Sequence, residues 1–115
     1  MKRPPEVDTW IAELAPADRE IYEAVESVIL STGLVDEIVY SYKLPTFKHG
    51  KLPVTVATWK GGISLAARSA APIEAFRAKH PEITGGKISV QFRRDAELPI
   101  DDLAELVRAA LMPPS

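Results

Sequence analysis

Residues 40–68 of this chain, YSYKLPTFKHGKLPVTVATWKGGISLAAR, decide the fold because they hold the alternating pattern of β-strands. Three runs alternate between the two sides of a strand with a period of two, which is typical of strands that bury one face; they are residues 38–44, 52–59 and 63–68. Residues 60–62, Lys-Gly-Gly, are a tight-turn signature that predicts a hairpin between the last two runs. The longer segment 45–51 is predicted to be the loop that joins the first two.

Helical periodicity surrounds this stretch. Apolar residues recur every three or four positions in four segments, near residues 7–14, 16–32, 72–80 and 99–111. One more alternating run lies at residues 87–92. The predicted order is therefore helix, helix, three strands, helix, strand, helix. We expect an α+β fold in which a mainly antiparallel, four-stranded sheet carries its helices on one face.

The alternation assigns the strand residues to two faces. The predicted core face consists of Ile38, Tyr40, Tyr42, Leu44, Leu52, Val54, Val56, Ile63, Leu65, Ala67, Ile88, Val90 and Phe92. Because Tyr42 is placed inside, its replacement by Asp is expected to unfold the protein. The opposite face is small, polar and basic, and is predicted to be open to water or to a partner.

Composition narrows the class of protein. At 115 residues we expect a single domain over residues 1–115, with loose ends at 1–5 and 113–115. The chain contains no cysteine, which excludes disulfides and thiolate metal sites. It has no apolar run long enough to span a membrane, so a cytoplasmic protein is expected. Charge is segregated: residues 6–37 carry nine acids and one base, whereas residues 43–94 carry ten bases and two acids.

The open face of the sheet is the first candidate site. Its side chains are small around the single large Trp59, which predicts a shallow hollow; the predicted ligand-binding residues are Ser41, Lys43, Trp59, Arg68 and Lys87. Such a hollow suits a small anion or an acidic segment of a protein partner. A plain hydrated face stays open as an alternative, and so does a homodimer in which two such faces stack. Dispersed cations and a net charge of −2 argue against nucleic acid as the ligand.

The motif Tyr42-Lys43-Leu44-Pro45-Thr46-Phe47-Lys48, followed by Gly50-Lys51, resembles the YdhG-like domain family when taken with the order of elements. Residues 71–76 and 87–92 are similar to a helix and a strand of that family. The usual motif has a glycine where this chain has Lys43. The resemblance implies an α+β fold. Most of the family has no established activity, and some members are described as frataxin-like intracellular iron chaperones.

Iron therefore has a candidate site as well. Glu20, Glu23 and Glu26 recur every three residues on the exposed side of the second predicted helix, and hard cations prefer oxygen ligands. The same pattern is that of an ordinary hydrated helix face, and only the resemblance favours iron. No enzyme is expected, because neither His49 nor His80 has a nucleophile or an orienting carboxylate at a recognisable spacing.

Overall fold

The computed structural model of the chain describes residues 2–113 and has nine elements of secondary structure. The helices are α1 (Pro5–Ala12), α2 (Pro16–Ser31), α3 (Ala70–Lys79) and α4 (Ile100–Leu111). The strands are β1 (Glu37–Ser41), β2 (Leu44–His49), β3 (Leu52–Trp59), β4 (Gly62–Ala67) and β5 (Ser89–Arg93). The predicted α+β class and the predicted order of helices are confirmed.

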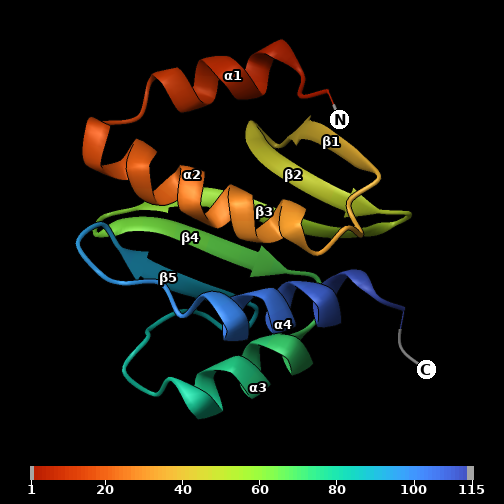
Figure 1. Cartoon of the computed structure of the whole chain (residues 1–115), viewed down its shortest axis with the longest axis vertical. Helices are drawn as coiled ribbons and strands as arrows, with labels where there is room; N and C mark the ends of the chain where they lie inside the picture. Colours follow the sequence, from red (N-terminus) through yellow and green to blue (C-terminus); the bar gives the residue numbers. More distant parts are fainter. Residues whose placement is uncertain (1, 114–115) are drawn as a thin grey trace.

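The five strands form one antiparallel sheet in the order β1-β2-β3-β4-β5, so every strand pairs with its neighbour in the chain. The helices form a single layer on this sheet (Figure 1), in which α2 and α4 are neighbours, α1 lies beyond α2, and α3 lies beyond α4. One continuous hydrophobic core fills the space between the two layers. None of the helices in residues 2–113 has the length and apolar character that a bilayer crossing requires.

The prediction of four strands was wrong, and the reason is a turn at Tyr42 and Lys43. Both residues have positive φ, 53° and 63°, which is the geometry of a type I′ hairpin turn. The chain therefore reverses at residue 42, and the segment predicted to be a loop becomes β2. Phe47 in this strand is fully buried and pairs with Ile38 on one side and Val54 on the other.

The predicted core face is confirmed in the three strands β3 to β5. Its buried members there are Val54, Val56, Ile63, Leu65, Ala67, Val90 and Phe92, joined by Ile38 of β1. Two predicted core residues are exposed instead. Tyr42 is 96% exposed because it occupies the hairpin turn, and Ile88 is 42% exposed because β5 begins only at Ser89.

The helices begin and end where local chemistry requires it. Prolines at the first helical positions, Pro5 and Pro16, start α1 and α2. Arg19 of α2 donates hydrogen bonds to the carbonyls of Ala12 and Leu14, at 2.9 and 3.1 Å, and so satisfies the end of α1. Within the predicted loose N-terminal end, residues 1–5, the Arg3 guanidinium contacts Glu26 at 2.9 Å, and residue 1 lies outside the described residues. Of the predicted C-terminal loose end, residues 114–115 lie outside the described residues.

Candidate ligand-binding site

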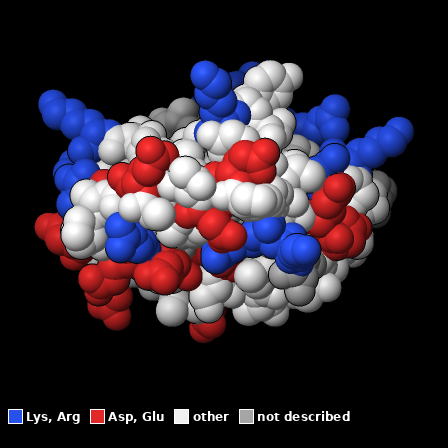
Figure 2. Space-filling model, turned by 90° about the horizontal axis from the view of Figure 1, so that it is seen from above, with Lys and Arg blue, Asp and Glu red and all other residues white. Residues whose placement is uncertain are grey.

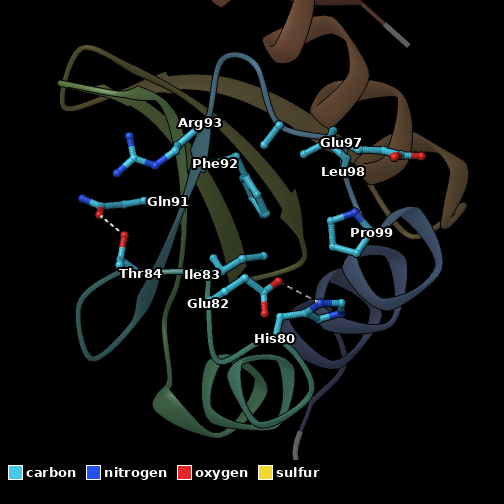
Figure 3. Close-up of a pocket in the computed structure, with 11 residues that line it drawn as sticks. His80, Glu82, Ile83, Thr84, Gln91, Phe92, Arg93, Glu97, Leu98 and Pro99 are labelled. Atoms are coloured by element: carbon cyan, nitrogen blue, oxygen red, sulfur yellow. Dashed lines mark hydrogen bonds and ion pairs between the residues drawn. The ribbon is translucent and has the colours of Figure 1, made fainter.

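A pocket with a volume of about 440 Å³ lies at the β5 edge of the sheet. Three segments enclose it: the loop from α3 to β5, the strand β5 itself, and the connection from β5 to α4. The residues that line it are His80, Glu82, Ile83, Thr84, Gln91, Phe92, Arg93, Ala96, Glu97, Leu98 and Pro99 (Figure 3). We call this site the His80 pocket.

Hydrogen bonds hold one wall of the His80 pocket against β5. The backbone N–H of Gln91 donates to the carbonyl of Thr84 at 2.8 Å, across the otherwise free edge of the sheet. The Thr84 hydroxyl donates to the side-chain oxygen of Gln91 at 2.9 Å (Figure 3). These two bonds join the α3–β5 loop to the strand and blunt an edge that would otherwise be unpaired.

The floor of the His80 pocket is apolar. Figure 3 shows Ile83, Phe92, Leu98 and Pro99 around the middle of the cavity. Phe92 is only 3% exposed, and its ring meets that of Phe76 edge to face, with centroids 6.2 Å apart. This packing keeps the Phe92 ring in place beneath the opening, so the floor is preformed.

His80 stands at one side of this floor, at the C-terminal end of α3, and is held from two directions. Its Nε2 lies 2.7 Å from Oδ2 of Asp102 in the first turn of α4, and its ring packs against Phe76 with centroids 4.9 Å apart. The hydrogen bond from His80 lowers the pKa of Asp102, and the nearby charge of Lys79 lowers it further. An ionised carboxylate only accepts hydrogen bonds, so Nε2 carries the hydrogen and Nδ1 faces Glu82 at 3.6 Å.

The lining of the His80 pocket combines a histidine and carboxylates with an apolar floor. Among the described residues, those that line the pocket include no serine, cysteine or lysine. The one hydroxyl in the lining, on Thr84, is already donated to Gln91. A histidine with a carboxylate on each side, next to an apolar floor, offers recognition of a polar group attached to an apolar body.

The sequence prediction missed this site because the partners are far apart in the chain. His80 and Asp102 are 22 residues apart, and no local spacing connects the end of one helix with the start of another. The available signals were separate: a histidine just before Pro81, and an Asp pair at the start of a helix. Neither signal indicates the other, so sequence spacing could not assign an orienting carboxylate to His80.

The structure does not bring the predicted open-face residues together. Trp59 and Arg68 lie at opposite ends of the sheet: Trp59 pairs with Gly62, and Arg68 follows six residues later, roughly 20 Å along the strand. Lys87 lies at the Arg68 end, just before β5. Ser41 and Lys43 lie at the other end, but on β1 and its turn, two strands away from β3.

Trp59 is engaged in local contacts instead. Its indole N–H donates to the carbonyl of Phe92 at 3.1 Å, and the guanidinium of Arg93 lies 5.7 Å from the ring centre. The ring also covers the hairpin turn, since a Cβ on Gly61 would approach it to 2.5 Å. The cation beside Trp59 is therefore Arg93, whereas Arg68 donates to the carbonyl of Lys51.

The three glutamates of α2 that were predicted to bind iron, Glu20, Glu23 and Glu26, differ in their surroundings. Glu20 and Glu23 are exposed, but Glu26 accepts hydrogen bonds from the Tyr22 hydroxyl at 2.7 Å and from Arg3 at 2.9 Å. Within residues 2–113 no cluster of three or more His, Asp or Glu side chains is placed to hold a metal ion. Seen from the end that carries α1, acidic side chains spread over the middle of the molecule while lysines and arginines project along its upper rim (Figure 2).

Comparison with protein-family models, with curated proteins and with solved structures gave no match for this chain. The resemblance to the YdhG-like family therefore stays a prediction that rests on the motif residues. The function is accordingly inferred from the geometry of the His80 pocket, and the chain is assigned here to no family.

Proposed function

We propose that this chain is a binding module that holds a small organic molecule in the His80 pocket and performs no chemistry on it. The observation that carries the proposal is the pocket itself. Its volume of about 440 Å³ lies within the range of roughly 300–1,000 Å³ that small-molecule sites occupy. It combines an apolar floor with a few placed polar groups, which is the usual composition of such sites.

The construction of the walls supports this proposal. The α3–β5 loop is bonded to β5 through Thr84 and Gln91, and the ring of Phe92 is fixed by Phe76. A ligand would thus meet a surface that is already formed, and little ordering of the protein would oppose binding. A cytoplasmic setting is part of the proposal, because a chain without cysteine gains nothing from an oxidising compartment.

The test is a titration of isotope-labelled protein with a library of small fragments, followed by NMR. We expect chemical-shift changes concentrated at the amides of Ile83, Phe92 and Leu98. Ala96 lies exposed at the rim, so Ala96→Phe should fill the opening and abolish the changes, whereas Ala24→Phe on the exposed side of α2 should leave them intact. If no fragment shifts the pocket amides, or Ala96→Phe binds as well as wild type, the proposal is overturned.

Binding of an acidic partner on the open sheet face is a second candidate. It is favoured by the cations on and around that face, none of which forms an ion pair with another described residue; they are Lys43, Lys48, Arg68 and Lys87. Poly-glutamate should then bind at low salt and lose affinity when Lys48 and Lys87 are changed to Gln. Association that depends on protein concentration alone would instead favour the homodimer.

Iron delivery, which the family resemblance implies, has less support in the geometry. Glu26 already serves Arg3 and Tyr22, which leaves Glu20 and Glu23 as a pair of exposed carboxylates. Two such ligands would hold ferrous iron only weakly. Calorimetric titration of wild type and of the Glu20→Gln, Glu23→Gln double variant decides the matter, because equal heats in both proteins would remove α2 as the iron site.

A further inference from the structure

The helices lie on one face of the sheet, and no element of residues 2–113 forms a second layer on the other, open face (Figure 1). The strand register shows which side chains share this open face. Its centre consists of Val39, Ser41, Leu44, Thr46, Thr55, Ala57, Ser64, Ala66, Ser89 and Gln91, all of them buried or half-buried already in the single chain. The sheet thus offers a broad, continuous surface that the described chain leaves uncovered.

Charge is absent from the centre of the open face and is found only around it. Glu37 and Lys48 pair with each other at one end of β1 and β2, Arg68 follows β4 at that same end, and Arg93 lies at the other end of β5. The solvated face of an antiparallel sheet usually carries polar and charged residues along each strand. The centre of a protein–protein interface is instead depleted of charge, and its rim is polar. The distribution on the open face is therefore that of an interface.

Hydroxyl groups on the open face already take part in hydrogen bonds. The side-chain oxygens of Thr46 and Thr55 lie 3.3 Å apart, across β2 and β3. The side-chain oxygen of Ser89 accepts a hydrogen bond of 3.0 Å from the backbone N–H of Gly86. Burial of a polar group is costly when its hydrogen bond to water is lost without replacement. A partner could thus cover this surface at little cost in unpaired polar groups.

We propose that a second copy of this chain covers the open face, so that two sheets stack face to face about a twofold axis. Five strands about 4.8 Å apart, with an average length of about six residues, span roughly 24 by 20 Å. Two such faces would together bury about 1,000 Å², which is close to the lower limit for a specific interface. The expected complex is therefore a weak, reversible dimer, and it is independent of the His80 pocket.

The charges at the rim favour a copy of this chain over an acidic partner. If two sheets stack with their strands aligned, the twofold axis runs either along the strands or across them. In the second copy, the corner that faces Glu37 is then either the start of β5, next to Lys87, or the β1–β2 turn, with Lys43. An acidic partner would instead meet Glu37 at the rim and no cation at the centre.

The experiment is sedimentation velocity of the full chain between about 5 and 500 µM, where a dissociation constant on the order of 10–100 µM is expected. Ala57→Lys places a charge at the centre of the open face and should weaken self-association at least about tenfold, because the dimer would bury that charge without a partner. Its control is Ala24→Lys on the exposed side of α2, which should associate like wild type. Thermal melts check that each variant is folded.

Ser64→Glu, with a charge of the opposite sign on the residue that pairs with Ala57, should weaken self-association as strongly. Poly-glutamate separates the two occupants, because an added lysine would strengthen the binding of an acidic partner. If the chain does not self-associate and Ala57→Lys binds poly-glutamate more tightly than wild type, the occupant is an acidic partner and the dimer proposal is overturned. It is also overturned if wild type stays monomeric throughout, or if Ala57→Lys and Ser64→Glu associate as strongly as Ala24→Lys.

Discussion

The guanidinium of Arg94 donates a hydrogen bond of 2.8 Å to the carboxylate of Asp18, although 76 residues separate the two in the chain. Arg94 begins the connection from β5 to α4, and its other end donates to the carbonyl of Lys60 in the β3–β4 turn at 3.2 Å. Asp18 lies in the first turn of α2, and its side chain is only 14% exposed. One side chain thus ties the outer wall of the His80 pocket to both layers of the fold.

Arg94→Ala is expected to loosen the connection that carries Ala96, Leu98 and Pro99. The amide of Ala96, which donates to the carbonyl of Arg93, should exchange its hydrogen faster, and pocket ligands should bind more weakly. High salt should reduce the difference from wild type, since Arg94 is partly exposed. The matched control is Arg108→Ala in the last turn of α4, which should leave both quantities unchanged. Equal exchange at Ala96 in both variants would contradict the role assigned to Arg94.

The type I′ turn offers a gain in stability. Lys43 has a φ of 63°, a region in which residues with a Cβ are strained and glycine is not. Lys43→Gly is therefore expected to raise the free energy of unfolding by about 0.5–1 kcal/mol, measured by urea denaturation. This substitution also introduces the residue that is usual at the corresponding place of the YdhG-like motif.

Lys51→Gly is the control for the turn. Lys51 lies in the next hairpin and has no positive φ, so its replacement by glycine should lower the free energy of unfolding by about 0.5 kcal/mol. Tyr42→Asp would destabilise the protein strongly if Tyr42 were in the core. Because its side chain is in solvent, we expect this substitution to change the free energy of unfolding by less than about 0.5 kcal/mol. A loss with Lys43→Gly would show that the turn has another geometry.

Tyr22 makes the fold sensitive to alkali. Burial raises the pKa of Tyr22 well above the ordinary value of tyrosine, and the hydrogen bond to Glu26 raises it further. The folded chain keeps this proton, whereas the unfolded chain loses it above about pH 10, so the free energy of unfolding falls as the pH rises past that value. Thermal melts between about pH 9 and pH 11 should show a drop in Tm that Tyr22→Phe reduces. Tyr42→Phe, at an exposed position, should keep the drop of the wild type, and the same drop in all three proteins would contradict the assignment.

The emission of Trp59 should respond to Arg93 and not to Arg68. Arg93 lies over the indole, whereas Arg68 is at the far end of β4. Fluorescence is best measured in a Trp10→Phe background, because Trp10 packs near Tyr22 and would add its own signal. In that background Arg93→Gln should shift the emission and Arg68→Gln should not. If the emission shifted with Arg68→Gln alone, the result would contradict this arrangement and support the sequence prediction that Arg68 lies near Trp59.

The sequence allowed most of the core to be predicted, since alternation in residues 52–59 and 63–68 is imposed by burial on one face. The turn at Tyr42 and Lys43 escaped prediction, because neither residue is among those that usually adopt positive φ. Without that turn, Pro45 and Gly50 indicate a loop, so the strand β2 is not predicted. The error therefore came from a single strained pair of residues and left the pattern of the later strands correct.

The candidate site could not be predicted in the same way. His80 and Asp102 meet because α3 and α4 pack side by side, and the separate helical patterns contain no information on that contact. The predicted group around Trp59 failed for a related reason. Alternation shows that Trp59 and Arg68 share one face of the sheet, but only the pairing of Trp59 with Gly62 shows how far apart they lie.

The neighbour order of the strands has a consequence for how the chain folds. Three short hairpins can close one after another, so the sheet from β1 to β4 forms without the entropy cost of joining distant segments. β5 can pair with β4 only after the connection through α3 has crossed over. α4 can dock on α2 and β3 only after that. The walls around His80 belong to these later elements, so the His80 pocket is expected to assemble after β1 to β4 have paired.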